Sequence, residues 1–246
     1  REELGRMGFV LYQNSKGFRF GTDSVLLAWF TASLIPRKRK VSILELGAGC
    51  GGAAMCLAAR LEEQKYDYIM DLVEIDPVSC GILKKNIEEN GLEGKVNAYC
   101  NDIRDLPRDI RGRQYDIVFS NPPYYVEGEG AGSSDPRLDL ARRGSYDTIS
   151  DFARAASSRL IPSTGIYAVV IDSKFSGKMA NSFTEAGINI SRVMPVFPNR
   201  RKDARLVLMA GRRRDNEETR ILPGIYLDDK DRMNEIYGEE HKDCFI

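Results

Sequence analysis

The sequence predicts an α/β fold with a doubly wound, mostly parallel seven-stranded sheet and a small N-terminal extension. Short apolar runs of strand length alternate with helical stretches from Val41 onward. Such repeated strand–helix units give parallel sheets with helices on both faces, because their crossovers are right-handed. Two apolar runs with no helix between them, Ile190–Val196 and Leu206–Ala210, predict an antiparallel finish. At 246 residues, 42% of them hydrophobic, the chain can bury one good-sized core.

The elements follow one another in a regular order. The helix from Pro77 opens with a proline, which the first turn tolerates, and it stops before Gly91. Near the N-terminus, Thr22 or Asp23 is the expected cap of a helix. Strands are expected at Val41–Leu46, Met70–Ile75, Val96–Cys100, Tyr115–Ser120, Gly165–Ile171, Ile190–Val196 and Leu206–Ala210, and helices at Gly52–Glu63, Pro77–Asn90, Ile149–Leu160 and Lys174–Ala186. We divide the chain into an N-terminal segment with a hairpin and a helix (1–40), a main domain (41–215) and a C-terminal tail that packs on it (216–246).

Composition argues against several kinds of site. The five cysteines form no C-x-x-C pair, and the only histidine, His241, lies near the C-terminus. Zinc sites, disulfide frameworks and histidine-based triads are therefore not expected, and we predict no metal. No apolar run reaches the roughly 18 residues of a membrane helix. We expect a cytoplasmic protein without membrane contact, and we favour a monomer.

Unusual residues gather where the predicted strands end, which is where open α/β sheets bind ligands. The first strand runs into LELGAGCGG, Leu44–Gly52, in which Gly47, Gly49 and Gly51 favour a tight turn. Gly47, Gly49 and Gly52 also fit the dinucleotide fingerprint G-x-G-x-x-G. The next acid at a strand end, Glu74, lies farther along than the roughly 20 residues of that fingerprint, which argues for a different ligand.

Three carboxylates indicate what that ligand is. Glu74 is placed to accept hydrogen bonds from a ribose diol, and Asp102, in CNDI after the third strand, suits an adenine amine. Glu45 puts a negative charge under the glycine loop, which repels a pyrophosphate and suits a ligand with an amino group. Taken singly, Glu74 and Asp102 also fit helix caps. As a set, these residues predict an adenosyl ligand with a positively charged amino-acid tail, S-adenosylmethionine.

These motifs resemble those of the class I methyltransferases, which have a Rossmann-like fold. LELGAGCG, VEID and CNDI are similar to the cofactor motifs of that family, and SNPPYY resembles its Asn-Pro-Pro-aromatic catalytic motif. Enzymes with this catalytic motif methylate amino groups that are conjugated to a π system. The resemblance implies cofactor contacts from Glu45, Gly47, Ala48, Gly49, Gly51, Glu74, Ile75, Asp102, Ile103 and Asn121.

The Asn-Pro-Pro-aromatic motif suits a nitrogen whose lone pair is delocalised and attacks poorly. The resemblance implies that the Asn121 side-chain oxygen and the Pro122 carbonyl accept the protons of that nitrogen and steady its developing positive charge. Pro122 and Pro123 stiffen the loop, and Tyr124 offers a face for the planar substrate. No general base is required, because the product ammonium loses its proton to water.

The N-terminal segment narrows the resemblance to one group of enzymes. KGFRFGTDSVLLAWF, Lys16–Phe30, resembles the Gly-Thr-Asp segment of the bacterial tRNA adenine-N6-methyltransferases that act beside the anticodon of a valine tRNA. DLARRGSYDTISDF and ARLVLMA match later segments of these enzymes, so the resemblance extends over nearly the whole chain. In related enzymes the N-terminal segment covers the cofactor, which implies contacts from Gly21 and Thr22. The ending HKDCFI departs from the pattern, because Cys244-Phe245 replaces a Phe-Tyr pair.

Local charge agrees with tRNA as the partner. The formal net charge is +0, but the stretches Pro36–Lys40 and Arg192–Arg214 are rich in Arg and Lys. An anticodon-loop base splayed from its stack would lie on Tyr124 or Tyr125. Contacts with phosphates or with the mouth of the site are expected from Arg19, Arg142, Arg143, Arg200, Arg201, Lys202 and the Arg212–Arg214 run.

Several other functions stay open on the sequence. A glutamine-amide methyltransferase acting on release factors has the same Asn-Pro-Pro-Tyr loop, but it has a longer helical N-terminal domain. An rRNA guanine-N2 methyltransferase differs mainly in an appended RNA-binding domain. Outside this class, the chain could be a non-catalytic RNA-binding module or a nicotinamide-dependent oxidoreductase.

Overall fold

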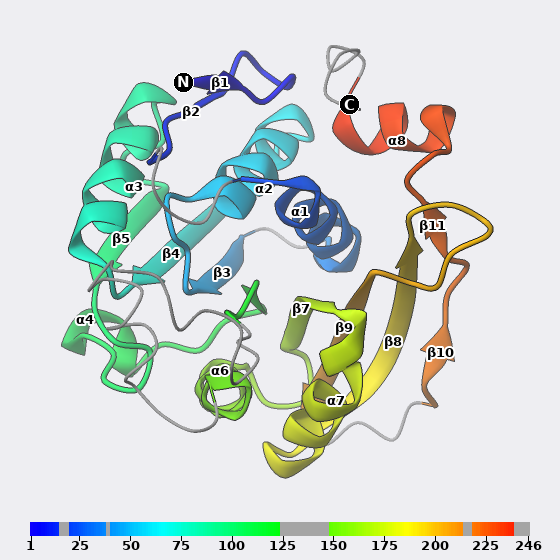
Figure 1. Cartoon of the computed structure of the whole chain (residues 1–246). Helices are drawn as coiled ribbons and strands as arrows, with labels where there is room; N and C mark the ends of the chain where they lie inside the picture. The colour runs from blue at the N-terminus through cyan, green and yellow to red at the C-terminus, as the bar shows by residue number, and fades with distance from the viewer. Residues whose placement is uncertain (15–19, 38–39, 124–147, 214–217, 239–246) are drawn as a thin grey trace, which may run out of the picture.

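A nine-stranded sheet forms the centre of the molecule (Figure 1). The computed structural model describes residues 1–14, 20–37, 40–123, 148–213 and 218–238. The strands in the middle of the sheet are buried on both faces, so they read as nearly continuous apolar runs. Four parallel strands form this part: β3 (Val41–Leu46), β4 (Tyr68–Glu74), β6 (Ile117–Ser120) and β7 (Ile166–Asp172). A fifth parallel strand, β5 (Val96–Cys100), lies at the edge beside β4 and is mostly half-buried or exposed.

The order of the strands is β10-β8-β9-β7-β6-β3-β4-β5. The chain steps outward from β3 to β4 and β5, then returns past β3 to β6 and β7, so the order reverses between β3 and β6. Such a reversal is where doubly wound sheets form their ligand crevice, outside the carboxyl ends of the strands. The strand β9 (Leu206–Arg213) runs antiparallel to both β7 and β8 (Ile188–Phe197), which confirms the predicted antiparallel finish.

Helices cover both faces of the sheet, as Figure 1 shows. Side chains alternate between the faces: Val41 and Ile43 join the core under α1, α2 and α3, whereas Leu44 and Leu46 join the core under α4, α6 and α7. The described helices of the two layers are α1 (Thr22–Leu34), α2 (Gly52–Glu63), α3 (Pro77–Glu89), α4 (Arg108–Arg111), α6 (Thr148–Arg159) and α7 (Ser176–Glu185). The predicted doubly wound α/β fold with seven long strands is therefore confirmed.

Local details differ from the predictions at two helix starts. The helix expected from Lys174 is divided into a 3-10 turn, η1 (Ser173–Phe175), and α7, which begins at Ser176. The Asp172 side chain caps η1 by accepting a hydrogen bond from the Lys174 amide at 3.0 Å. Neither Thr22 nor Asp23 caps α1. Its cap is Gly21, which makes no side-chain bond, so the prediction of a capping side chain was wrong.

Short elements at the two ends complete the fold. A small antiparallel pair, β1 (Glu2–Glu3) and β2 (Val10–Leu11), contacts α3, where Asn90 Oδ1 accepts a hydrogen bond from the Val10 amide at 2.8 Å. Two two-residue strands, β10 (Arg220–Ile221) and β11 (Ile225–Tyr226), extend the sheet beyond β8. The last described helix, α8 (Lys230–Tyr237), packs on α1. Within the described ranges, no helix combines the length and apolar character needed to cross a membrane.

Candidate active site

The glycine loop leaves β3 at the point where the strand order reverses. The amides of Gly47 and Ala48 both donate to the carbonyl of Val73 (2.9 and 3.0 Å), so the loop stays joined to β4 after the sheet pairing ends. Gly49 and Gly51 have φ values of 56° and 90°, a conformation that L side chains rarely adopt. The turn delivers the chain directly into α2, whose cap is Gly51.

The carboxylate of Glu74 closes this loop from the neighbouring strand. One oxygen accepts from the Gly49 amide at 2.7 Å, and the other accepts from the Asp76 amide at 2.8 Å. Burial raises the pKa of Glu74, and these backbone donors offset part of that rise. The predicted acid at the end of the second strand therefore lies at the mouth of the predicted glycine turn.

Glu45 lies beneath the loop and is 2% exposed. Its Oε2 atom has no hydrogen-bond partner within the described part of the chain. Burial, and then the charge of Glu74, raise the pKa of Glu45 well above its ordinary value. Two carboxylates that repel each other in a buried place, one with an unpartnered oxygen, form an environment suited to a positively charged ligand group.

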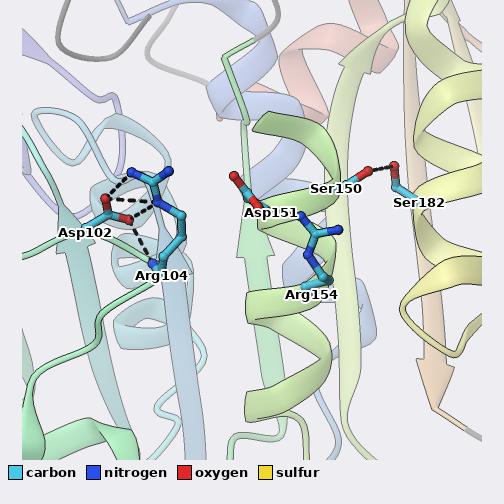
Figure 2. A network of polar contacts seen from close by, with 6 residues as sticks. All are labelled: Asp102, Arg104, Ser150, Asp151, Arg154 and Ser182. Carbon is cyan, nitrogen blue, oxygen red and sulfur yellow. Dashed lines mark hydrogen bonds and ion pairs between the residues drawn. The ribbon is translucent and has the colours of Figure 1, made fainter. Parts of the chain in front are cut away.

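Asp102 lies beyond the end of β5 and is bound by Arg104 (Figure 2). Its carboxylate accepts from the Arg104 amide at 2.8 Å and from the guanidinium at 2.5 to 3.1 Å. These bonds lower the pKa of Asp102, and the charge of Asp151 in α6 further supports the Arg104 cation. An adenine amine would have to share this carboxylate with Arg104, a partner that the CNDI motif does not indicate.

Asn121 leaves the sheet beside the glycine loop, because Ser120 in β6 pairs with Leu46 in β3. Its Nδ2 donates to the Asp23 carboxylate at 2.7 Å. No partner for Asn121 Oδ1 occurs among the residues that the structure describes. Pro122 is buried and Pro123 is half-buried. The bond to Asp23 holds the Asn121 amide in one orientation. Its oxygen is therefore available at the point where the strand order reverses.

The start of α1 lies against the same loop. The ring of Phe20 packs so closely on Gly52 that an added Cβ there would lie 2.8 Å from the ring. This contact places Gly21 and Thr22 near the glycine loop, and Thr22 Oγ1 accepts a hydrogen bond from the Tyr237 hydroxyl at 3.0 Å. Asp23 belongs to the same Gly-Thr-Asp segment, and its sequence pattern is that of a helix cap, which does not indicate its contact with Asn121.

With this geometry established, comparison with known proteins identifies the family. The family model described as the methyltransferase small domain matches residues 21–185. The chain belongs to this family. The match begins at Gly21 and so includes the segment that contributes Asp23, the glycine loop, the acidic strand ends and the Asn-Pro-Pro motif of this methyltransferase.

Individual proteins resemble this methyltransferase over most of its length. A tRNA1(Val) (adenine(37)-N6)-methyltransferase of Pectobacterium carotovorum is 27% identical, over 99% of this chain and 95% of its own. A protein of the same name from Flavobacterium psychrophilum is 30% identical, over 87% of each chain. Among solved structures, a putative class I S-adenosylmethionine-dependent methyltransferase of Listeria monocytogenes has a TM-score of 0.63 at 15% identity, covering 91% of this chain and 73% of its own. Family and fold confirm the predicted enzyme class and its cofactor, S-adenosylmethionine.

The residues of the site fit this cofactor chemically. The unpartnered Oε2 of Glu45, near the charge of Glu74, suits a cationic ligand group. A Cβ built on Gly49 meets no atom within 4 Å, so there is open space above the loop. Ile75, which is 38% exposed, and the partly buried Ile103 are the apolar residues at the ends of β4 and β5. The individual contacts that we predicted from the motifs stay predictions.

The predicted basic residues separate into two groups. Arg200, Arg201 and Lys202 are exposed in the turn after β8. Since β8 runs in the same direction as β7, this turn lies at the carboxyl edge of the sheet. With β9 and β7 between β8 and β6, at about 4.8 Å per strand, β8 lies roughly 14 Å to the side of β6. The register places Val193 level with Ser120, and the turn begins only after Phe197, about 13 Å farther along β8, so the turn is roughly 20 Å from the end of β6.

Arg212 and Arg213 belong to the other edge of the sheet. The antiparallel strand β9 ends there, and Arg212 pairs with Ile166 at the start of β7. The expectation that they lie at the same rim as Arg200 was therefore wrong, because antiparallel pairing reverses the direction of the strand. Their contact with phosphates stays a prediction. The residues Arg19, Tyr124, Tyr125, Arg142, Arg143 and Arg214 lie outside the described residues. No cluster of three or more potential metal ligands occurs in the described ranges.

Proposed function

We propose that this methyltransferase transfers a methyl group to the exocyclic N6 amine of an adenosine in the anticodon loop of a tRNA. The observation that carries the proposal is Asn121 Oδ1, which has no hydrogen-bond partner among the described residues and lies at the end of β6, beside the glycine loop. The relatives named as tRNA1(Val) (adenine(37)-N6)-methyltransferases support adenosine in tRNA as the substrate. We expect the enzyme to act in the cytoplasm as a monomer.

The proposed chemistry follows from the properties of an amino group attached to adenine. Its lone pair is delocalised into the ring, so its nitrogen is a poor nucleophile. Asn121 Oδ1 and the Pro122 carbonyl would accept the two amine protons and draw the nitrogen toward tetrahedral geometry. These bonds strengthen as positive charge develops on the nitrogen, so they favour the transition state over the bound substrate.

The remaining residues of the site would position the reactants. Bound S-adenosylmethionine supplies a methyl group on a sulfonium, and Glu74, Asp102 and the glycine loop are proposed to hold its ribose and adenine. Pro122 and Pro123 limit the motion of the acceptor loop, because proline fixes φ. Holding reactants in line in this way accounts for a large part of the acceleration in two-substrate reactions.

The exposed turn at 200–202 is proposed to contact tRNA phosphates. Three cations lie there in sequence beyond β8, at the same edge of the sheet as Asn121. A separation of roughly 20 Å would put them outside the catalytic crevice, at a distance suited to backbone phosphates a few nucleotides from the flipped base. Tyr124, Tyr125, Arg19 and Arg142 stay predicted substrate contacts from the sequence.

Nucleoside analysis tests the proposed reaction. An unmodified anticodon stem–loop with adenosine next to the anticodon is incubated with enzyme and isotopically labelled cofactor, digested and examined by mass spectrometry. We expect labelled N6-methyladenosine, which disappears with Asn121→Ala while S-adenosylhomocysteine still binds. A matched stem–loop with guanosine at that position should stay unlabelled. Label in guanosine, or label in a release-factor protein but not in the stem–loop, would overturn the proposal in favour of one of the alternatives.

A further inference from the structure

The contact between Asp23 and Asn121 joins two parts of the chain that are distant in sequence. Asp23 belongs to the first turn of α1, and Asn121 follows β6; their side chains meet at 2.7 Å. The helix α1 packs against β6 and β7, so the contact is supported by the packing of whole elements. Asp23 Oδ1 also accepts from the Ser24 amide at 2.9 Å, and each oxygen of the carboxylate therefore has a partner.

The chemistry of the two groups determines which way the Asn121 amide points. An ionised carboxylate only accepts hydrogen bonds, whereas an amide has a donor end and an acceptor end. Asp23 must therefore face the NH2 group of Asn121, and the oxygen must face away from Asp23. An amide turned by 180° would put two acceptors against each other and would offer donors to the substrate amine, which is itself a donor.

We propose that Asp23 is a positioning residue, which fixes the Asn121 amide with its oxygen directed toward the substrate amine. This role rests on the proposed function of Asn121 as an acceptor. A bond to a charged carboxylate also polarises the amide, which makes Oδ1 a better acceptor for a nitrogen that gains positive charge. Asp23 then acts on the reaction through Asn121 and needs no contact of its own with substrate.

Replacement of Asp23 by asparagine tests this role with almost no change in shape. An asparagine at 23 can either donate or accept, so the amide at 121 no longer has one favoured orientation. Loss of one charge-assisted bond corresponds to a fall in kcat of roughly 10–100-fold. The KM for the stem–loop and the Kd for S-adenosylhomocysteine should stay within about twofold, because the lost interaction strengthens mainly in the transition state.

Asp231→Asn is the matched control. Asp231 also lies in the first turn of a helix, α8, and the two substitutions remove the same charge from the same helical position, although Asp231 is exposed and Asp23 is half-buried. Asp23→Asn should lose somewhat more thermal stability than Asp231→Asn, because Asp23 also bonds the Asn121 side chain. Only Asp23→Asn should lose kcat.

A swap of the two residues separates positioning from simple structural support. Asn121→Asp alone sets two carboxylates against each other, so we expect activity at least about 100-fold below wild type at pH 8, with a partial recovery in acid, where one carboxylate takes up a proton. The double variant Asp23→Asn, Asn121→Asp restores a donor–acceptor pair and leaves a carboxylate oxygen for the substrate. It should exceed the single variant by at least about tenfold at pH 8.

Two results would contradict the positioning role of Asp23. Wild-type kcat in Asp23→Asn, or a double variant no more active than Asn121→Asp, would overturn the positioning role. Side-chain amide resonances of Asn121 in a ¹⁵N-labelled protein report the contact without any substrate, and Asp23→Asn should shift them and speed their exchange. If these resonances respond while wild-type enzyme fails to methylate the stem–loop, the proposed substrate fails and the contact survives; unchanged resonances refute the contact itself.

Discussion

Gly49 and Gly51 contribute to the site for different reasons, and alanine at each position separates these reasons. Both residues have positive φ, which disfavours an L side chain by about 1–2 kcal/mol. A Cβ on Gly51 would lie 2.5 Å from Leu83 Cδ1, far inside van der Waals contact. A Cβ on Gly49 would meet no atom within 4 Å. The first glycine is thus open toward a ligand, and the second is required by packing.

The predicted losses of stability follow from these contacts. In Gly51→Ala, overpacking against the fully buried Leu83 adds about 1–3 kcal/mol to the backbone term, so the free energy of unfolding falls by about 2–5 kcal/mol. At about 2–4 °C per kcal/mol for a chain of this size, Tm falls by roughly 4–20 °C. Gly49→Ala has only the cost of placing an L side chain at positive φ, so its Tm falls by roughly 2–8 °C.

Cofactor affinity should change in the opposite order. The methyl group of Gly49→Ala points into the open space above the loop, where we place the cofactor. We expect the Kd for S-adenosylhomocysteine to rise at least tenfold, which corresponds to about 1.4 kcal/mol. The methyl group of Gly51→Ala points at Leu83, so the folded fraction of that variant should bind within about threefold of wild type.

Denaturant unfolding and calorimetric titration with S-adenosylhomocysteine measure the two quantities on the same samples. Gly81→Ala in α3 is the control, because a Cβ there meets nothing within 4 Å and its φ is not positive. It should raise stability by about 0.5–1 kcal/mol, the usual gain of alanine over glycine in a helix. Wild-type affinity in Gly49→Ala, or a loss of stability as large as that of Gly51→Ala, would contradict the separate roles of the two glycines.

Three further predictions concern charge. Burial raises the pKa of Glu45 above its ordinary 4.5, so the folded protein holds the carboxyl proton more tightly than the unfolded chain, and wild type loses stability as pH rises toward the folded pKa. The free energy of unfolding of Glu45→Gln should therefore increase relative to that of wild type between pH 5 and pH 8. A difference between the two proteins that stays constant over this range would contradict the prediction. Arg60, buried in α2, donates to the carbonyls of Cys56 and Ile236, so Arg60→Met should lower the free energy of unfolding by about 1–3 kcal/mol in urea melts, more than Met at the exposed Arg108. The triple variant Arg200→Ala, Arg201→Ala, Lys202→Ala should bind the stem–loop with a weaker salt dependence: the negative slope of log affinity against log salt should become less steep by up to about 2. The double variant Arg212→Ala, Arg213→Ala, at the opposite edge, should leave this slope unchanged.

The sequence predicted the parts of the fold that depend on local pattern. Apolar runs bounded by Gly, Pro and Asp indicated β3, β6 and β7, because buried parallel strands are apolar on both faces. The glycine loop was predictable for the same kind of reason, since positive φ at Gly49 and Gly51 restricts the residue type. Glu74 was found because a parallel sheet brings the ends of its strands to one edge.

The parts that were missed depend on contacts between distant residues or on strand direction. Arg212 looked equivalent to Arg200, but β9 reverses the chain and carries it to the far edge. Asp102 and its partner Arg104 are close in sequence, yet nothing in CNDI indicates that the carboxylate turns back onto the guanidinium. Asp23 showed the pattern of a capping residue, and only the packing of α1 on β6 brings it to Asn121.

The helix α1 connects the proposed acceptor to α8, the last described helix. Its first turn holds Asn121 through Asp23, and the adjacent Thr22 accepts from Tyr237 of α8. Two arginines in turn bind the last turn of α8, since Arg60 donates to the carbonyl of Ile236 and Arg6 donates to that of Glu235. A hydrogen bond weakens steeply with misalignment, and a small displacement of an acceptor reduces catalysis strongly. We therefore expect substitutions that displace α8, and with it the start of α1, to disturb the orientation of the Asn121 amide.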